Sequence, residues 1–278
     1  MKRILVPCDF SKLSMEAFKM AHDIAQKAQG EIVVLYAVYI PTLYDPTLMG
    51  ETIAYNAQLI TDLEEESKRN FEKMKKEYGH ASVKTSLEVL TGDVLVCIQQ
   101  TIESKHIDLV VMGTSGTSGL EEFFIGSNTE KVVRHAHVPV MAIRAFRPVE
   151  SIRNILLPST LALDQTAFMK KVKELQSFFH ATLHVLLVNT PTHFRRDAEA
   201  KEAFNEFAKQ YQLTNFVFHF KNYRNEEEGI VDFMRSEKAD LVAMGTHARK
   251  GLAHLFNGSI TENVVNHMQS SSVWTYAL

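Results

Sequence analysis

The fold is decided by a stretch of sequence that the chain carries twice. Val111-Met112-Gly113-Thr114 returns about 132 residues later as Ala243-Met244-Gly245-Thr246. At the same offset, Gly126-Ser127-Asn128-Thr129-Glu130-Lys131-Val132-Val133 returns as Gly258-Ser259-Ile260-Thr261-Glu262-Asn263-Val264-Val265. Near the start, Ile4-Leu5-Val6-Pro7 returns as Ile155-Leu156-Leu157-Pro158. A repeat of this length has the size of a domain. The sequence therefore predicts two homologous domains in tandem, residues 1–146 and 150–278.

Around these repeated stretches, short apolar runs alternate with segments of helical periodicity. In the first copy we expect strands at residues 4–6, 31–38, 83–90, 108–112 and 138–143, and helices at 13–28, 59–78, 94–104 and 128–135. Gly30 and Gly79 stand where two of these helices are expected to stop. Near-continuous apolar strands separated by helices are typical of a parallel sheet covered on both faces. The fold class is thus α/β, two tandem doubly wound domains, and a ligand is expected beyond the carboxyl ends of the strands.

Composition excludes several classes of protein. The chain has 278 residues and a formal charge of −3, from 30 basic and 33 acidic side chains. So small an imbalance gives no reason to expect nucleic acid or a membrane surface as a partner. No apolar run approaches the roughly 18–20 residues that span a bilayer. Two cysteines, Cys8 and Cys97, are too few for a disulfide scaffold. We expect a cytoplasmic protein.

A glycine-rich segment follows the strand expected at 108–112. It reads Gly113-Thr114-Ser115-Gly116-Thr117-Ser118-Gly119, and Gly126-Ser127 then opens the next helix. Glycines allow positive φ and let backbone amides approach a ligand, while a helix N-terminus favours phosphate. Ser127 is equally an ordinary helix cap. By itself the pattern leaves two interpretations open, a phosphate loop and a plain strand–turn–helix connection.

The spacing of these residues resembles a known family. Gly113, two residues, Gly116, nine residues and then Gly126-Ser127 is similar to the nucleotide-binding pattern of ATP-binding universal stress proteins. The resemblance covers the whole chain once per copy, and it includes Ile4-Leu5-Val6-Pro7-Cys8-Asp9-Phe10-Ser11. It implies, for each domain, a five-stranded parallel sheet of order 3-2-1-4-5. It also implies ATP or a related adenine nucleotide at the switch point, with Mg²⁺ left open as a companion.

Site residues follow from the same resemblance. It implies that Asp9 and the backbone of Val38 hold the adenosine part, and that ribose and phosphates are held by Gly113, Gly116, Gly126, Ser127 and Asn128. Asp9 has a second interpretation, since an acid before Ser11 could simply cap the first helix.

The second copy departs from the pattern. Thr160 stands in place of Asp9, Asn189 matches Val38, and Ala248 replaces the second glycine. What remains is Gly245, Gly258 and Ser259. An added methyl at a close-approach position costs about 1 kcal/mol or blocks the ligand. We therefore expect nucleotide in the first copy, and weak binding or none in the second.

The expected function is that of a nucleotide-dependent regulator in stress response. No P-loop and no nucleophile elbow is present, and no residue can be assigned a catalytic role. At most, slow ATP turnover is expected. Two alternatives stay open: a tandem scaffold that binds proteins or a small ligand without nucleotide, and a slow ATPase that phosphorylates itself. The protein partner is unknown. The last strands, 138–143 and 273–277, are expected to pair and form an intrachain pseudo-dimer, with a homodimer left open.

Other features are expected to be structural. His135 and His137 have no third ligand at fixed spacing, so no metal site is expected. Cys8 is expected to be a buried strand-end thiol rather than a redox group. Glu226-Glu227-Glu228 is expected to lie on a solvated face or turn. The segment from Ile40 to Ala57 is expected to be a long loop that either covers the nucleotide or covers the seam between the domains.

Overall fold

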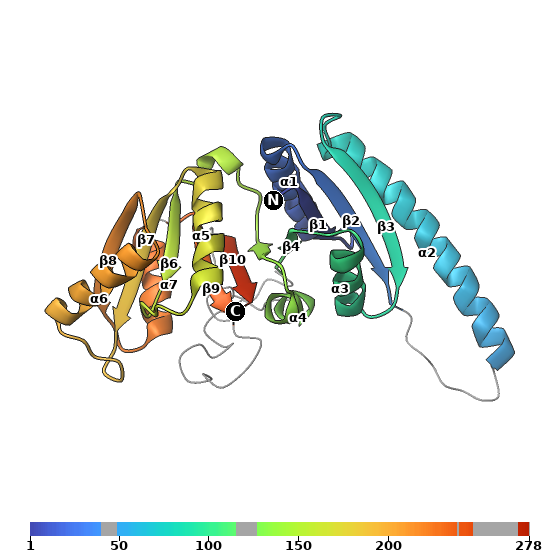
Figure 1. Ribbon diagram of the computed structural model, residues 1–278. Helices are drawn as coiled ribbons and strands as arrows, with labels where there is room; N and C mark the ends of the chain where they lie inside the picture. Colours follow the sequence, from blue (N-terminus) through green and yellow to red (C-terminus); the bar gives the residue numbers. More distant parts are fainter. Residues whose placement is uncertain (40–48, 115–126, 238, 247–271, 278) are drawn as a thin grey trace. The chain divides into compact units, whose positions relative to one another are not determined.

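The computed structural model describes residues 1–39, 49–114, 127–237, 239–246 and 272–277, and only the backbone of residues 49–56. These residues belong to two compact units, Met1–Gly113 and Thr114–Leu278 (Figure 1). Five residues expected in the nucleotide pattern of one copy or the other lie outside the described residues: Gly116, Gly126, Ala248, Gly258 and Ser259.

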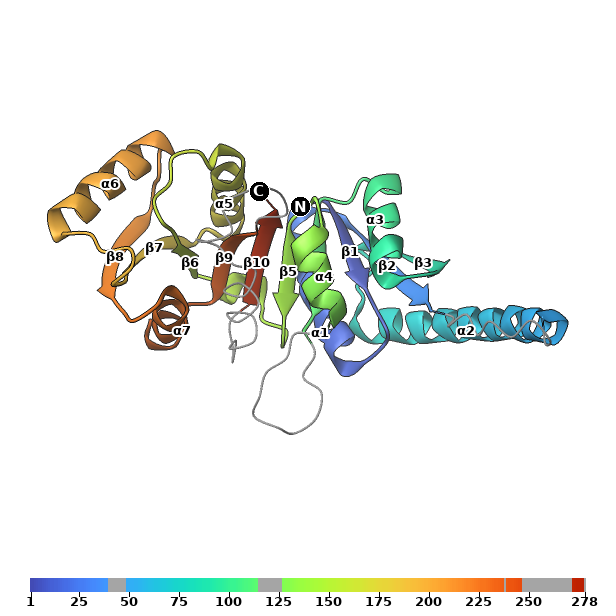
Figure 2. The same cartoon turned by 90° about the horizontal axis from the view of Figure 1, so that it is seen from below.

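The first unit is a parallel sheet with helices on both faces. Its elements are β1 (Arg3–Pro7), α1 (Lys12–Ala28), β2 (Glu31–Val38), α2 (Met49–Tyr78), β3 (Lys84–Thr91), α3 (Val94–Ser104) and β4 (Leu109–Gly113). The strands lie in the order β3-β2-β1-β4. Figure 2 shows α1 and α2 on one face of this sheet and α3 on the other.

The second unit carries the end of the first repeat and the described part of the second. Its elements are α4 (Ser127–His135), β5 (Val140–Ile143), the 3-10 turn η1 (Val149–Ser151), β6 (Asn154–Pro158), α5 (Thr166–Phe179), β7 (Thr182–Asn189), α6 (Asp197–Gln210), β8 (Phe216–Asn222), α7 (Glu226–Ser236), β9 (Leu241–Thr246) and β10 (Ser272–Ala277). The second repeat's strands lie in the order β8-β7-β6-β9-β10, all parallel. This is the predicted order 3-2-1-4-5, so the predicted fold class is confirmed.

The last strands of the two repeats pair as predicted. β5 runs antiparallel to β10, with Met141 opposite Trp274 and Ala142 opposite Val273. Each of these four side chains is 1% exposed or less. The pairing covers an edge of each strand that would otherwise present unpaired amides and carbonyls.

Burial explains why these segments form these elements. In β1, Ile4, Leu5 and Val6 are fully buried, as expected for a parallel strand with both faces covered. On α6, Phe204 stacks on Phe218 of β8 with ring centroids 4.0 Å apart. These aromatic side chains thus pack α6 against β8.

The expected loop from Ile40 to Ala57 is wrong over most of its second half. α2 begins at Met49, about ten residues before the predicted helix start at Leu59. Residues 40–48 lie outside the described residues. Helix-forming residues such as Glu51, Ala54 and Gln58 favour the extension locally, although they do not continue the apolar periodicity on which the prediction rested.

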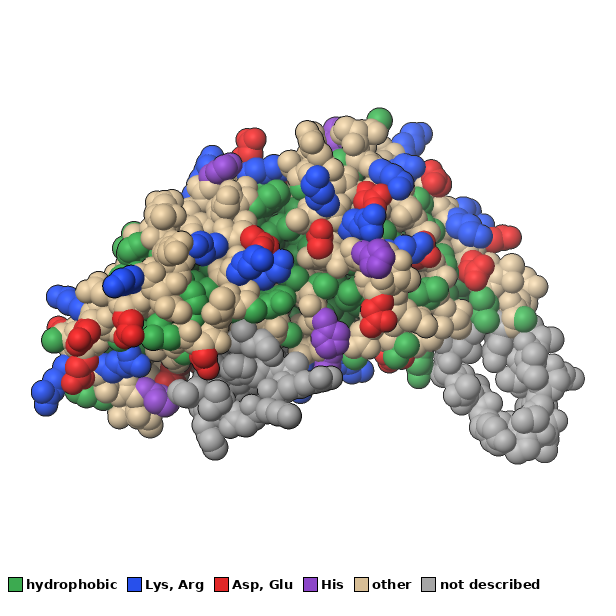
Figure 3. Space-filling view, viewed as in Figure 1, with side chains coloured by type: hydrophobic (Ala, Val, Ile, Leu, Met, Phe, Trp, Pro, Cys, Tyr) green, Lys and Arg blue, Asp and Glu red, His purple; other side chains and the backbone are tan. Residues whose placement is uncertain are grey.

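Charge is spread over the surface as the small net charge suggests. On the face drawn in Figure 3, basic and acidic side chains intermingle within each unit. Within the described part of the chain, none of the helices has the length and apolar character that crossing a membrane requires.

Candidate functional site

Three of the predicted site residues lie at the carboxyl ends of neighbouring strands in the first unit. Asp9 follows β1, Val38 ends β2 and Gly113 ends β4, and β1 pairs with both of the other strands. The chain leaves β1 through α1 toward β2 and later returns to β4 on the opposite side. The carboxyl ends of β1 and β4 are thus the topological switch point, where ligands bind in open α/β sheets.

Asp9 presents an ionised carboxylate at this point. Its Oδ1 accepts a hydrogen bond from the amide of Ser11 at 3.0 Å, while the N-cap of α1 is Ser11, whose side chain accepts from the amide of Ser14. Partial burial raises the pKa of Asp9, but hydrogen bonds from Ser11 and Ser14 outweigh it, so the pKa lies below its usual value. Asp9 therefore holds the turn before α1 instead of capping the helix, and it remains an acceptor for a ligand.

The turn that carries Asp9 has an unusual backbone. Phe10 adopts a positive φ of 59°. The sulfur of Cys8 accepts from the amide of Phe10 at 3.4 Å and lies 3.4 Å from the hydroxyl of Ser14. Burial raises the pKa of the Cys8 thiol, although the contacts with Ser14 and Phe10 lower it in part. Cys8 is 6% exposed and protonated at neutral pH, which agrees with the predicted structural role.

Val38 contributes backbone rather than side chain to the site, because its side chain is 2% exposed. Its carbonyl already accepts a hydrogen bond from the amide of Gly92 at 2.9 Å. A carbonyl oxygen has two lone pairs, so one remains for another donor.

Gly113 has a packing role that sequence reasoning missed. A Cβ on Gly113 would lie 2.8 Å from the carbonyl oxygen of Leu13 in the first turn of α1. Its φ is not in the left-handed region, since Gly92 is the glycine that the described residues place there. Glycine is needed at position 113 because α1 passes close to the end of β4.

Ser127 and Asn128 begin α4 in the second unit, and both are exposed. The helix starts one residue before its predicted start at Asn128, so Ser127 is its first residue. The first amides of an α-helix lack intrahelical partners and carry partial positive charge, which favours an anion there.

The second repeat places its counterparts in the same way. Thr160 follows β6, Asn189 ends β7, and Gly245 lies in β9. Asn189 is 6% exposed, and its side chain is engaged, since Nδ2 donates to Asn222 and Oδ1 accepts from the amide of Arg195. Its carbonyl accepts from the amide of Tyr223, as the carbonyl of Val38 does from the amide of Gly92.

A pocket of about 150 Å³ opens at these strand ends. Besides the ends of β6, β7 and β9, it is lined by His193 and Arg195 from the loop before α6 and by Glu226 and Ile230 of α7. Nδ1 of His193 lies 2.9 Å from a carboxylate oxygen of Glu226. The expected solvated face or turn at Glu226-Glu227-Glu228 is the first turn of α7, where the helix dipole favours an acid; Glu228 is exposed, but Glu226 is half-buried in the pocket.

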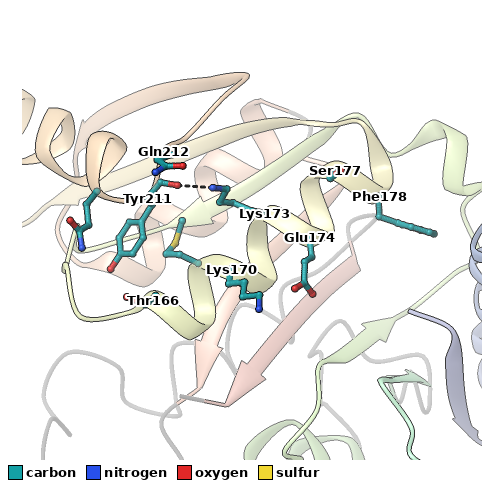
Figure 4. A pocket seen from close by; sticks show the side chains of 10 residues that line it. Thr166, Lys170, Lys173, Glu174, Ser177, Phe178, Tyr211 and Gln212 are labelled. Carbon is teal, nitrogen blue, oxygen red and sulfur yellow. Dashed lines mark hydrogen bonds between the residues drawn. The ribbon is translucent and has the colours of Figure 1, made fainter.

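A larger hollow of about 770 Å³ lies along α5 and the end of α6 (Figure 4). Lys170, Lys173 and Tyr211 line it, and Nζ of Lys173 donates to the Tyr211 carbonyl at 2.9 Å. None of the predicted site residues borders this hollow. Among the described residues there is also no group of three His, Cys, Asp or Glu side chains arranged to hold a metal ion.

Comparisons with known proteins agree with the tandem architecture. Residues 1–144 and 152–274 each match the model of the Universal stress protein family. A universal stress protein of Methanocaldococcus jannaschii is 35% identical over 144 residues, which are 51% of this chain and 82% of that protein. A universal stress protein of Synechocystis sp. is 25% identical over 290 residues, covering 95% of this chain and 96% of that protein.

A solved structure gives the same fold over the full length. The crystal structure of a universal stress protein from Archaeoglobus fulgidus superimposes with a TM-score of 0.78, covering 99% of this chain and 98% of that chain at 18% identity. Because the family model matches nearly all of the chain, once in each half, this protein belongs to the universal stress protein family with two family domains in tandem.

Proposed function

We propose that the first repeat, residues 1–146, binds ATP or a related adenine nucleotide, and that the protein is a nucleotide-dependent regulator in stress response rather than a fast catalyst. The observation that carries this proposal is the ionised carboxylate of Asp9 at the switch point of the first unit. It stands between the ends of β2 and β4, which are the strands that supply Val38 and Gly113.

Each group of the predicted set has a suitable chemistry for such a ligand. An ionised carboxylate only accepts hydrogen bonds, so Asp9 suits the hydroxyl or amino donors of an adenosine. The free lone pair of the Val38 carbonyl suits a second donor. Ser127 and Asn128, at the start of α4, suit phosphate oxygens. If Mg²⁺ accompanies the nucleotide, phosphate oxygens and water would supply most of its ligands, as is usual for this ion.

The same set argues for binding rather than turnover. It contains one carboxylate, glycines, a hydroxyl and an amide, and no lysine or arginine. Fast phosphoryl transfer relies on cations placed against the transferring group. Phosphate release is therefore expected to be slow, and nucleotide occupancy would act by ordering the site and so changing a surface that a protein partner reads.

A cytoplasmic location and two domains at residues 1–146 and 150–278 form part of the proposal. Cys8 and Cys97 are both free and buried, which suits a reducing compartment.

Calorimetry and thermal unfolding of the full chain with ATP test the proposal. At 100 times its dissociation constant, a ligand of the folded state adds about 2.7 kcal/mol of stability. Asp9→Asn keeps the oxygen that accepts from Ser11 but removes the charge, so we expect the ATP affinity to fall about tenfold. Asp164→Asn removes the same charge from an exposed position in the second repeat and is expected to leave ATP affinity unchanged.

The result that would overturn the proposal is an absence of both heat and stabilisation with ATP, ADP and AMP for the wild-type chain. A protein partner that then co-purifies would favour the scaffold alternative, and rapid phosphate release would favour an enzyme.

A further inference from the structure

The pocket of about 150 Å³ in the second repeat differs in chemistry from the first repeat's candidate site. It lies at the corresponding strand ends, because Thr160 follows the first strand of its repeat as Asp9 does. A cavity of about this volume accepts a benzene molecule in an engineered protein core, whereas sites for drug-sized ligands enclose about 300–1,000 Å³. The pocket has room for one ring or one short branched chain.

The inner wall of this pocket is apolar. Leu186 of β7, Ile230 of α7 and Met244 of β9 line it, and all three belong to one buried cluster, with exposures of 0%, 4% and 3%. Such a wall offers hydrophobic and dispersion contacts and no hydrogen bonds. The part of a ligand that enters it must be apolar.

Arg195 supplies a cation at the edge of the pocket. Its side chain is half-buried, and its Nη2 donates to the carbonyl of Thr160 at a long 3.4 Å. Among the described residues, no carboxylate lies within salt-bridge distance of this guanidinium. A guanidinium has five N–H donors and prefers a planar carboxylate partner. A half-buried cation without such a partner favours an anionic ligand.

The acid in the pocket is already paired. Oε1 of Glu226 contacts His193 Nδ1 at 2.9 Å and accepts from the hydroxyl of Thr190 at 3.2 Å. Burial raises the pKa of Glu226, but hydrogen bonds from its backbone amide, His193 and Thr190 lower the pKa by more than burial raises it. The pKa therefore lies below its usual value, and the carboxyl group is ionised. Glu226 is thus engaged with His193 and Thr190, and it lies outside salt-bridge distance of Arg195.

This pocket lacks the carboxylate that the first repeat offers to an adenosine, because Thr160 stands in place of Asp9. The side-chain amide of Asn189 is engaged with Asn222 and Arg195. Besides His193 and the paired Glu226, the pocket presents an apolar wall and the cation of Arg195 on its rim.

We propose that this pocket binds a small carboxylic acid with an apolar body of about the size of a benzene ring. The apolar body lies against Leu186, Ile230 and Met244, and the carboxylate pairs with Arg195. The second repeat is then a sensor of an organic acid, distinct from the nucleotide site proposed for the first repeat.

Benzoate is the probe for the aromatic form of this ligand and 4-methylpentanoate for the aliphatic form. Binding to the full chain is measured by ligand-observed NMR and by thermal unfolding. We expect at least one of the two acids to bind, and its uncharged amide, benzamide or 4-methylpentanamide, to bind at least about tenfold more weakly.

Arg195→Gln removes the cation and is expected to abolish the preference for the acid over the amide. Arg235→Gln removes an exposed cation from the far end of α7 and is the matched control, expected to retain that preference. Ile230→Phe fills the apolar wall and is expected to abolish binding while the ligand-free melting temperature shows that the chain is folded.

Three outcomes would overturn the inference: neither acid binds the wild-type chain, Arg195→Gln leaves the acid affinity unchanged, or ATP displaces the acid and Arg195→Gln weakens ATP. The nucleotide proposal fails separately, since it depends on Asp9→Asn and ATP alone.

Discussion

The carboxyl ends of β1 and β6 have the same backbone conformation and hydrogen bonding, but they differ in their side chains. The amide of Cys8 donates to the Leu35 carbonyl at 2.9 Å, and that of Ser159 donates to the Leu186 carbonyl at 2.9 Å. Phe10 and Leu161 both adopt positive φ, at 59° and 63°. Yet an ionised Asp9 in one repeat corresponds to an uncharged Thr160 in the other. The backbone of these strand ends is duplicated, and the side chains placed on it differ.

The same duplication holds at the opposite ends of these strands. Asp108 Oδ2 accepts from the amides of Lys2 and Arg3, at 2.7 and 3.3 Å. Asp240 Oδ2 accepts from the amides of Arg153 and Asn154, at 2.9 and 3.0 Å, and its Oδ1 accepts from Arg147 at 2.6 Å. The Asp240 side chain is 14% exposed against 44% for Asp108, so the two aspartates differ in environment more than in role.

The largest expected effect is a loss of stability when Asp240 is replaced, and it should exceed the loss when Asp108 is replaced. Asp240→Ala is expected to destabilise the protein by about 3 kcal/mol, because it leaves two amides and Arg147 without an acceptor at a half-buried position. Asp108→Ala is expected to cost about 1 kcal/mol, because water can replace its more exposed carboxylate. Urea unfolding measures both, and equal losses would contradict the difference in environment.

The next largest effect is expected from Gly113→Ala, which tests the packing of this glycine against α1 independently of ligand binding. The added Cβ would meet the Leu13 carbonyl, so we expect a loss of about 2 kcal/mol in the absence of any nucleotide. Ser127→Ala is the companion variant at the start of α4 and is expected to lower ATP affinity at nearly unchanged ligand-free stability. If Gly113→Ala instead unfolds like the wild type, the close approach of α1 does not constrain this glycine.

A pH effect is expected from a histidine pair in the second repeat. His184 Nδ1 lies 3.0 Å from His219 Nε2, and His184 Nε2 lies 3.2 Å from Asn154 Oδ1. The amide oxygen of Asn154 accepts from Nε2 of His184, and in the neutral pair Nδ1 of His184 accepts from Nε2 of His219. Burial lowers the pKa of both histidines, and the neighbouring charge of His184 lowers that of His219 further, although Glu237 opposes this.

These lowered pKa values give the sign of the effect. The unfolded chain binds protons at these histidines near pH 6.5, and the folded chain binds them at a lower pH. Their contribution to the free energy of unfolding is therefore fully present above about pH 6.5 and decreases as the pH falls below it. Each histidine adds a slope of at most about 1.4 kcal/mol per pH unit. Replacing both histidines by Gln is expected to weaken the pH dependence of the free energy of unfolding, measured with urea between pH 7.5 and 5. His137→Gln, at an exposed position, is expected to leave this pH dependence unchanged.

The smallest expected effect comes from giving the second repeat the acid of the first. Thr160→Asp is expected to add no ATP binding, because Arg195, which contacts the backbone of residue 160, would pair with the new carboxylate. It is expected to weaken benzoate or 4-methylpentanoate a few-fold by pairing with Arg195. A gain of ATP affinity would mean that a single side chain separates the two sites.

Several elements could be predicted closely from local pattern. The ranges expected for β2 and α3 are the ranges observed, because β2 is a dense β-branched run and α3 is an apolar periodic segment that opens after the capping carboxylate of Asp93. The role of Gly30 could not be predicted in this way. Gln29 takes the left-handed cap with φ 52°, and Gly30 is needed because a Cβ there would collide with the carbonyl oxygen of Lys2.

Of the candidate site, the sequence predicted which strand ends carry it and missed part of its chemistry. Asp9 and Val38 lie where the resemblance implies, at adjacent strand ends. His193, Arg195 and Glu226 were missed as pocket residues because no spacing rule joins them. The one available signal was a histidine and an arginine in the short loop after β7, the strand of the second repeat that corresponds to β2.

The sequence by itself determined the duplication and the alternation of strands and helices. These are properties of periodicity and local spacing, which the chain carries in every segment. Only the tertiary structure decided that His193 meets Glu226 across 33 residues and that Arg195 reaches Thr160 across 35. The physical reason is that such meetings depend on strand order and on the path of each loop, which no local pattern encodes.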